Sequence, residues 1–181
     1  MGINNKYKLK NNKALIIREA EPCDAKDLIQ YINKVAGESD NLTFGEGEFN
    51  VNVEQEKKII QNSLNSPRDL FLIAEVDGRI VGNLTFRSGK RPRTKHSGEF
   101  GITVLKKYWG LGIGKLLMKT LLDWAKSEGQ IKKINLRVRF DNHKAIKLYE
   151  KMGFEKEGKI KRGFLVNGKF IDIIAMGICL D

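Results

Sequence analysis

The segment 108–115 carries the clearest chemical signal in this sequence of 181 residues, because Gly110, Gly112 and Gly114 are closely spaced within it. An apolar, β-branched stretch (100–105) precedes the segment and a helical pattern of leucines (116–122) follows it, so the glycines lie where a strand turns into a helix. Glycine lets the backbone approach a ligand closely, and the first N–H groups of a helix have no partner within the helix. Such a turn is suited to binding an anion, most often a phosphate.

Two better-known phosphate loops do not fit the segment. A Walker A loop requires Ser or Thr after its Gly-Lys pair, but Lys115 is followed by Leu116. A dinucleotide-binding fingerprint requires Gly-x-Gly-x-x-Gly and an acidic residue at the end of the next strand. Here the glycines are evenly spaced, and the predicted strand 134–138 does not end in an acid.

The turn instead resembles the pyrophosphate loop of the GCN5-related N-acetyltransferases (GNAT), whose pattern is Arg/Gln-x-x-Gly-x-Gly/Ala. Gly112 and Gly114 match the two small positions, and Trp109 stands where Arg or Gln is usual. The segment 141–154 resembles the second marker of the family, Asn-x-x-Ala-x-x-x-Tyr-x-x-x-Gly-Phe. The matching residues are Asn142, Ala145, Tyr149, Gly153 and Phe154. Both segments occur in the family's order, so the sequence is identified as a GNAT member over residues 15–180.

The resemblance implies an α/β (α+β) fold, in which about four helices flank a mixed, mostly antiparallel, twisted sheet of about seven strands. In this fold the sheet is splayed between its fourth and fifth strands. The pattern along the chain predicts strands at 15–18, 70–76, 79–86, 98–105, 133–139, 154–166 and 170–180, and helices at 24–36, 53–64, 113–127 and 142–151. Asp77-Gly78 and Asn167-Gly168 predict hairpin turns. We expect one domain, 14–181, after a flexible Asn/Lys-rich lead-in, 1–13, that lacks the apolar core of a secretory signal.

The resemblance also implies an N-acetyltransferase that uses acetyl-CoA as cosubstrate and transfers the acetyl group directly in a ternary complex. Glu99, at the start of the strand before the turn, is the candidate base, acting through water; otherwise it is an ordinary charged residue near a strand end. Tyr149 matches the family's general acid, and a phenol with a pKa of ~10 is protonated at neutral pH. Otherwise Tyr149 is a core aromatic residue at helical spacing with Ala145 and Met152.

The cofactor-binding residues follow from the same resemblance. The backbone of Ile102, Thr103 and Val104 would pair with the pantetheine arm like an added strand, and Gly101 would supply a bulge that opens the slot. Asn142 would contact the pantetheine or its pyrophosphate, while also serving as a helix N-cap. The pyrophosphate would lie on Trp109, Gly110, Leu111, Gly112, Ile113, Gly114 and Lys115. Trp109 packs either beside the turn or in the core, and we expect the core.

Two loops border the acceptor site in the family, and they point to different acceptors. The loop between the first two helices combines acids with aromatics, which suits a cationic amine; Phe44 and Glu46 are its candidate substrate-binding residues. The loop 87–96 is basic and is either solvated or attracts an anionic acceptor, a ribosomal site or the cofactor. A small primary amine is the expected acceptor. A ribosomal, N-terminal or lysine amine of a protein is the alternative, and a non-catalytic CoA- or nucleic-acid-binding module is disfavoured.

Composition narrows the remaining classes. The net charge of +11 fits steering of coenzyme A, a nucleic-acid or ribosomal partner, or a generally lysine-rich surface. No aromatic RNA-binding motif stands out, and apolar runs fall short of the ~20 residues that a membrane span needs. Cys23 and Cys179 lie far apart in sequence, which favours reduced thiols and a cytoplasmic location. No Cys/His cluster has metal-ligand spacing, so no metal is expected, and a homodimer is common in the family.

Overall fold

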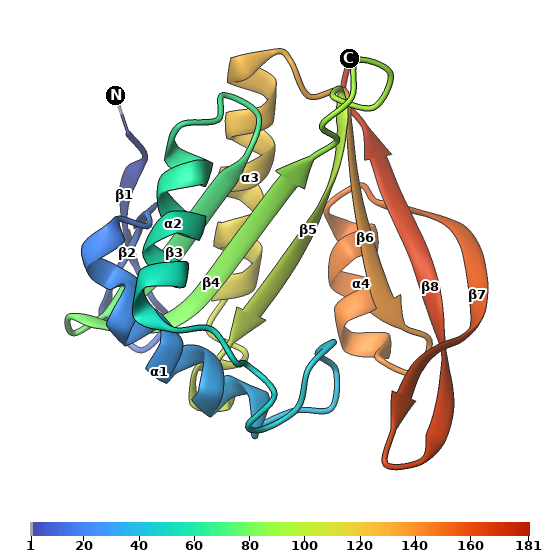
Figure 1. The fold of residues 1–181 in the computed structure, drawn as a ribbon, viewed down its shortest axis with the longest axis horizontal. Coiled ribbons are helices and arrows are strands. Elements are labelled where there is room, and N and C mark those ends of the chain that lie inside the picture. The colour runs from blue at the N-terminus through green and yellow to red at the C-terminus, as the bar shows by residue number, and fades with distance from the viewer. Residues whose placement is uncertain (1) are drawn as a thin grey trace.

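The computed structural model describes residues 2–181 and contains one eight-stranded sheet with helices on both faces (Figure 1). The strands are β1 (Asn4–Lys8), β2 (Ala14–Glu19), β3 (Leu70–Val76), β4 (Arg79–Ser88), β5 (Ser97–Val104), β6 (Lys133–Arg139), β7 (Glu155–Val166) and β8 (Lys169–Cys179). The helices are α1 (Ala25–Ala36), α2 (Val53–Leu64), α3 (Ile113–Glu128) and α4 (His143–Lys151), with short 3₁₀ turns η1 (Pro22–Asp24) and η2 (Lys106–Tyr108). The predicted fold class is therefore confirmed.

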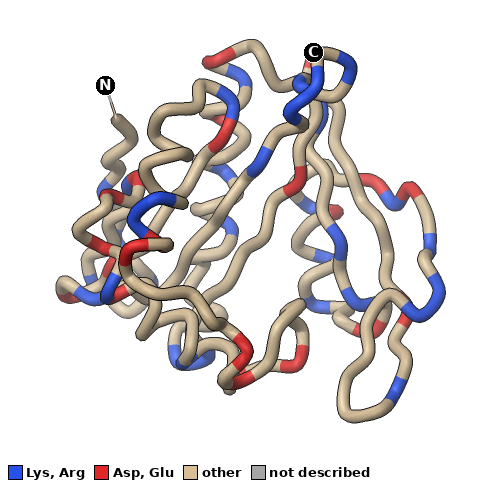
Figure 2. The backbone as a smooth tube through the Cα atoms, viewed as in Figure 1, with Lys and Arg blue, Asp and Glu red and all other residues tan. Residues whose placement is uncertain are grey.

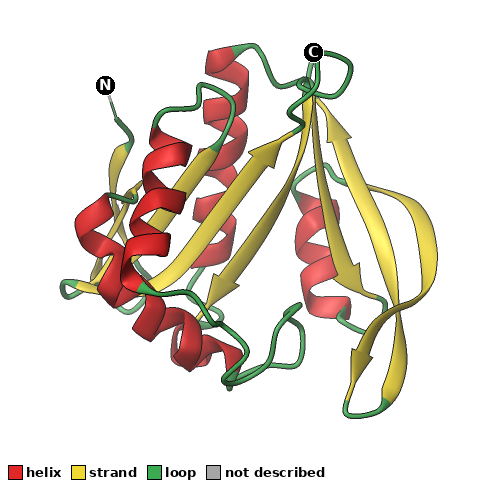
Figure 3. Ribbon diagram, in the orientation of Figure 1, coloured by secondary structure: helices red, strands yellow, loops and turns green. Residues whose placement is uncertain are grey.

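The strands lie in the order β1-β2-β3-β4-β5-β6-β8-β7, and β5–β6 is the parallel pair in an otherwise antiparallel sheet. The helices α1 and α2 cover one face, and α3 and α4 cover the other (Figures 1 and 3). Between these layers the central strands and α3 bury a continuous apolar core, whose largest fully buried side chains include Phe86, Leu72, Leu84, Leu117 and Leu121. No helix of the described chain is both long enough and apolar enough to cross a membrane.

The N-terminal segment differs from the prediction of a flexible lead-in over residues 1–13. Residues 4–8 form β1, which pairs with β2 from Asn4↔Arg18 to Lys8↔Ala14, and Leu9 is buried; Met1 lies outside the described residues. Most side chains of β1 are polar and exposed, so the segment shows no apolar alternation. It is ordered through main-chain hydrogen bonds to the neighbouring strand, which a hydropathy pattern does not record.

The predicted splay lies between β5 and β6, the fourth and fifth of the strands expected from the sequence. These strands pair only at Ser97↔Lys133, Gly98↔Ile134 and Glu99↔Asn135, and then they diverge (Figure 1). The prediction of a bulge at Gly101 is wrong, because Gly101 pairs with Thr85 in a β4–β5 register that has no shift. The opening results from the end of β5–β6 pairing after Glu99.

Both predicted hairpin turns are present. Asp77 and Gly78 have φ of 52° and 71°, and Asn167 and Gly168 have φ of 49° and 73°, the left-handed pairs that a two-residue turn requires. The second turn closes the β7–β8 hairpin, which continues past the end of β6 (Figure 1).

The first helix is fixed to the sheet by an ion-pair network. The Asp24 carboxylate, at the N-cap position of α1, does not cap the helix but accepts two hydrogen bonds of 2.8 Å from the Arg18 guanidinium and one of 2.7 Å from the Glu21 N–H. Burial alone would raise the pKa of Asp24, but the hydrogen bonds from Arg18 and Glu21 outweigh it and lower that pKa. Arg18 of β2 also pairs with Glu75 of β3 at 2.9 Å, so the network ties the start of α1 to these two strands.

Candidate functional site

The glycine turn between β5 and α3 presents a series of unpaired backbone donors. Gly110 and Gly112 have φ of 79° and 91°, a left-handed conformation that other residues rarely adopt. Gly112 is the N-cap of the 16-residue helix α3, whose first internal hydrogen bond runs from the Leu116 N–H to the Gly112 carbonyl, 3.0 Å. Within residues 2–181, no group accepts a hydrogen bond from the N–H groups of residues 110–115. These donors lie at the positive end of the helix dipole and fit a pyrophosphate.

Trp109 lies at this turn and not in the core, so the expectation of core packing is wrong. Its side chain is 42% exposed, and its indole Nε1–H donates to the Val104 carbonyl at 2.7 Å. The Lys144 ammonium lies 5.7 Å from the centre of the indole ring, within range of a cation–π interaction. Trp109 therefore ties the turn to the end of β5 and to the first turn of α4.

The three predicted cofactor-binding segments meet at the splay. Beyond Glu99, the edge of β5 that faces β6 has no strand partner, which leaves the backbone of residues 102–104 open on that side. A Cβ atom at Gly114 would lie 3.9 Å from the side chains of both Ile102 and Leu148, so the start of α3 packs against β5 and α4. Asn142 caps α4 by accepting a hydrogen bond from the Ala145 N–H at 3.2 Å, so its structural role is present.

A cavity of about 610 Å³ runs from the splay onto the sheet face that α1 and α2 cover. Its lining comes from five regions: the loop after α1 (Asn41, Leu42, Thr43, Phe44, Phe49), α1 and α2 (Ile32, Glu56, Ile59), strands β3–β6 (Phe71, Asn83, Thr85, Arg87, Glu99, Phe100, Gly101, Ile102, Thr103, Leu136, Arg137, Val138), α4 (Asn142, Tyr149) and the β7–β8 hairpin (Gly163, Phe164, Ile173). Both candidate catalytic residues thus line one space.

Tyr149 lies in the core and also lines the cavity, and its role as general acid stays a prediction. The ring is 9% exposed and packs edge-on against Phe100 and Phe154, with centroid distances of 6.1 and 6.2 Å. Burial raises the pKa of its phenol to about 12, so the hydroxyl is protonated at neutral pH. Tyr149 is therefore a core aromatic residue whose side chain also reaches the cavity.

Glu99 lies at the last β5–β6 pair, at the point where the sheet opens. Its carboxylate oxygen is 3.3 Å from the Arg137 Nε atom, and its side chain is 47% exposed. In the sheet it stands opposite Arg87 of β4. The carboxylate is oriented by a guanidinium, faces the cavity and remains open to water, an arrangement that permits proton transfer through a water molecule.

A hydrogen-bonded chain in the cavity wall was not predicted from the sequence. The Tyr31 hydroxyl of α1 lies 2.7 Å from the Thr103 hydroxyl, which donates in turn to the Asn83 side-chain oxygen. Burial raises the pKa of Tyr31 above its ordinary value, so this phenol is neutral. These hydrogen bonds join α1, β4 and β5 beside the open end of β5. No local sequence motif predicts them, because the three residues are far apart in sequence.

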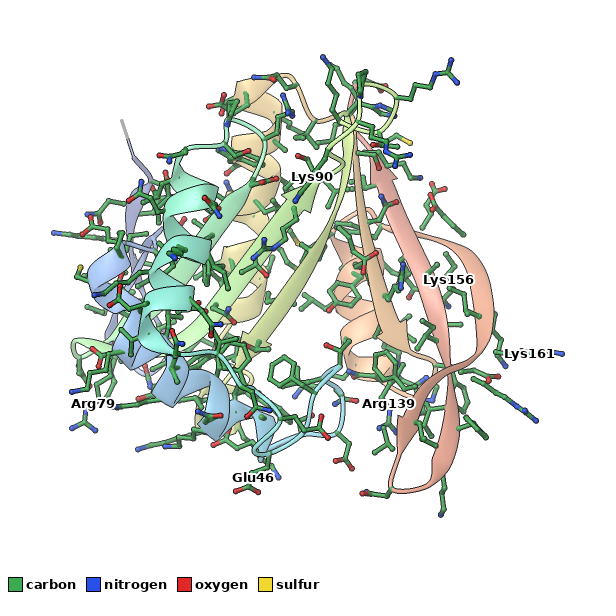
Figure 4. All side chains as sticks on the ribbon, viewed as in Figure 1. Glu46, Arg79, Lys90, Arg139, Lys156 and Lys161 are labelled. Atoms are coloured by element: carbon green, nitrogen blue, oxygen red, sulfur yellow. The ribbon has the colours of Figure 1, made fainter. Side chains whose placement is uncertain are left out.

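The two predicted substrate-binding residues have different positions. Phe44 lines the cavity and packs against Phe49, with ring centroids 5.8 Å apart. Glu46 does not line the cavity; it lies beside Gly37 and extends away from the sheet (Figure 4). Glu56 of α2, which is 2% exposed, is a cavity-lining carboxylate that was not predicted. The feature of the sequence that indicates its burial is its helical spacing from Ile60, because both residues lie on the inward face of α2.

The basic loop lies at the opposite end of β5 from the glycine turn (Figure 2). It precedes Ser97, whereas the turn follows Val104, and a strand of this length spans about 25 Å at 3.3 Å per residue. The side chains of residues 90–96 are exposed, and only Arg87 of the predicted loop lines the cavity. Among residues 2–181, no three His, Cys, Asp or Glu side chains are grouped as metal ligands would be.

Comparisons with known proteins agree with this geometry. The family model described as "Acetyltransferase (GNAT) family" matches residues 38–154. The L-amino acid N-acetyltransferase AaaT of Escherichia coli is 38% identical over 105 residues, which is 58% of this chain and 65% of that enzyme. The spermidine N(1)-acetyltransferase of Vibrio cholerae is 35% identical over 82 residues, 45% of this chain and 47% of that enzyme. The aligned parts thus cover less than two thirds of either relative.

A solved structure agrees over nearly the whole chain. The crystal structure of the acetyltransferase of GNAT family from Streptococcus pneumoniae superposes with a TM-score of 0.89 at 33% identity, covering 92% of this chain and 99% of that one. The sequence motifs, the splayed sheet and these matches lead to one conclusion: the chain belongs to the acetyltransferase (GNAT) family of N-acetyltransferase enzymes.

Proposed function

We propose that the protein transfers the acetyl group of acetyl-CoA to a primary amine of a small molecule, by direct attack in a ternary complex. The observation that carries the proposal is the cavity of about 610 Å³, which Glu99 and Tyr149 both line where the sheet opens. Its volume is in the range of small-molecule sites. The loop after α1 and the β7–β8 hairpin enclose it from two sides, which favours a small acceptor over a folded protein surface.

The binding of acetyl-CoA is supported by three features of the chain. The unpaired amides of residues 110–115 fit the pyrophosphate, the open edge of β5 fits the amide groups of the pantetheine arm, and the splay leads to Tyr149. When bound, acetyl-CoA supplies the activated acetyl group as a thioester.

Side chains of the protein would then accept and donate the protons of the reaction. An amine must be neutral to attack, and Glu99 would accept its proton through water from the exposed side of the cavity. The departing thiolate needs a proton, which the neutral Tyr149 hydroxyl would donate. The buried position of Tyr149 keeps that proton on the phenol until it is needed.

The acceptor class is tested by a screen of primary amines and peptides for acetyl-CoA-dependent thiol release. We expect turnover with small amines and little with peptides. Two named relatives, an L-amino acid and a spermidine N-acetyltransferase, act on small amines and support this choice. Turnover restricted to peptides or ribosomal proteins, or no thiol release with any amine, would overturn the proposal.

The basic loop offers a separate test of the alternative protein acceptor. Because the side chains of Arg91 and Arg93 lie outside the cavity, the double variant R91E/R93E should change small-amine kcat/KM and acetyl-CoA affinity by less than about twofold. Steady-state kinetics and calorimetry would measure both. A large loss confined to macromolecular substrates would instead favour a protein acceptor that this loop attracts.

Glu99 provides a test of the proposed base. We expect Glu99→Gln to lower kcat/KM about tenfold at neutral pH, less than the usual range for general catalysis, because solvent can reach this exposed position and accept the proton. Arg137→Gln, which removes the ion-pair partner but keeps the carboxylate, should retain most of the rate. If Glu99→Gln has wild-type kcat/KM across the pH range, the carboxylate is not the base.

A further inference from the structure

Glu56 is exceptional among the buried polar side chains of the described chain. Asp24, Glu56 and Thr120 are buried; Asp24 is paired with Arg18, and the Thr120 hydroxyl donates to the Leu116 carbonyl. No described residue forms a hydrogen bond or an ion pair with the Glu56 carboxylate. The oxygens of Glu56 are not among the fully enclosed, unsatisfied polar atoms of the described chain, so the carboxylate keeps contact with the cavity, where a bound cation could pair with it.

The position of Glu56 indicates what would pair with it. Glu56 and Ile60 form the buried face of α2, and Glu56 lines the acceptor side of the cavity with Ile59, Phe71 and Thr85. The rings of Phe44 and Phe49 line the same space. A carboxylate among aromatic rings is a favourable environment for an ammonium or guanidinium group.

The other charged residues of the cavity do not satisfy this carboxylate. Glu99 is paired with Arg137. Arg87 is exposed on β4, and its charge lowers the pKa of Glu56 by less than burial raises it. Burial is the larger effect and raises that pKa overall. The carboxylate is therefore free to pair with a cationic group that enters the cavity.

We propose that Glu56 is a specificity-determining residue that binds a second cationic group of the acceptor, so that the preferred substrates are amines carrying another ammonium or guanidinium group. The attacking amine must be neutral, so the cation at Glu56 is a different group on the same molecule. This inference rests on the proposed N-acetyltransferase function and narrows its substrate class to diamines and related polycations.

The test compares two acceptors of equal length, 1,4-diaminobutane and pentylamine, which differ in whether the far end is an ammonium or a methyl group. We expect the wild-type kcat/KM to be at least tenfold higher for the diamine. This factor corresponds to about 1.4 kcal/mol, the order of magnitude of a hydrogen bond to a charged group. Glu56→Gln should reduce this preference to about threefold or less, and its affinity for acetyl-CoA should equal that of the wild type. Glu54→Gln, which alters an exposed carboxylate on the same helix, should keep the preference.

A second readout separates recognition from a structural role. If Glu56 serves the ligand and not the fold, Glu56→Leu should have a melting temperature equal to or above that of the wild type. A lower melting temperature for Glu56→Leu, with the diamine preference intact in Glu56→Gln, would overturn the inference. A wild-type preference for pentylamine or for 5-aminopentanoate, whose far end is an anion, would overturn it as well.

The outcomes also separate this inference from the proposed function. Turnover of monoamines without a diamine preference would exclude the role of Glu56 and leave the acetyltransferase function standing. If no amine were turned over, calorimetric binding of 1,4-diaminobutane to the wild type and to Glu56→Gln would still test Glu56. Equal binding of the two proteins would overturn the inference, and binding by the wild type alone would support it.

Discussion

Replacing Tyr149 by Phe should lower kcat about 100-fold while leaving the affinity for acetyl-CoA unchanged, because proton donation to a leaving group contributes at least this factor in general acid catalysis. The expected loss exceeds that for Glu99→Gln because the two sites differ in access to water. Glu99 is about half exposed, whereas Tyr149 is 9% exposed, so solvent cannot readily replace the missing hydroxyl.

The Tyr149→Phe variant should also separate an effect on catalysis from an effect on stability. The hydroxyl has no hydrogen-bond partner among residues 2–181, and the ring contacts with Phe100 and Phe154 remain after its removal. The free energy of unfolding should therefore change little. Tyr7→Phe, at a partly buried tyrosine of β1, is the matched control and should keep full activity. Wild-type kcat for Tyr149→Phe would assign Tyr149 to packing alone.

The pH profile gives an independent check on the same residue. Burial raises the pKa of Tyr149 from 10.0 to about 12, so the acid form persists to higher pH than for an exposed phenol. Ionisation of Tyr149 should therefore cause no fall in kcat between pH 7 and about 10. An alkaline limb below pH 10 that disappears in the Phe variant would show that the phenol titrates earlier than its burial implies.

The parts of the site that the sequence predicted are those encoded by neighbouring residues. The turn at 110–115 and the α4 marker each place their functional groups within one local segment. Gly114 of the turn lies against Ile102 and Leu148, and α4 supplies Asn142 and Tyr149 to the cavity. The bounds of α2 were also predictable, because Asn52 and Gln55 cap its start and Pro67 follows soon after its end.

The features of the site that the sequence did not predict depend on tertiary packing, as for Glu56, or on the polar group of an amphipathic side chain, as for Trp109. Glu56 has a buried position because α2 packs over the sheet, and nothing in its neighbours distinguishes it from the exposed Glu54 except the spacing from Ile60. Trp109 was expected in the core. Its indole N–H instead donates to the Val104 carbonyl at the end of β5, and this hydrogen bond holds the ring at the surface.

Replacing Gly112 by Val should weaken acetyl-CoA binding by about 10- to 100-fold, equivalent to the loss of one or two hydrogen bonds to a charged group. A β-branched residue is strongly disfavoured at the φ of 91° that Gly112 adopts, so the turn would relax and rotate the amides of residues 110–115 away from a common centre. No atom lies within 4 Å of a Cβ placed at Gly112, so the variant should remain folded with a modest loss of stability.

The C-terminal end of the same helix provides a matched control for Gly112→Val. Gly129 follows α3 with a φ of 67° and also has no atom within 4 Å of the position that a Cβ would take, so Gly129→Val introduces comparable backbone strain far from the turn. Both variants should lose roughly 1–2 kcal/mol in chemical denaturation, but only Gly112→Val should lose affinity for acetyl-CoA in calorimetry. If the two variants bind acetyl-CoA equally, the free amides at the start of α3 do not hold the pyrophosphate. Because the same strain is placed at both ends of α3, an affinity loss confined to Gly112→Val can be traced to the turn amides and not to reduced stability.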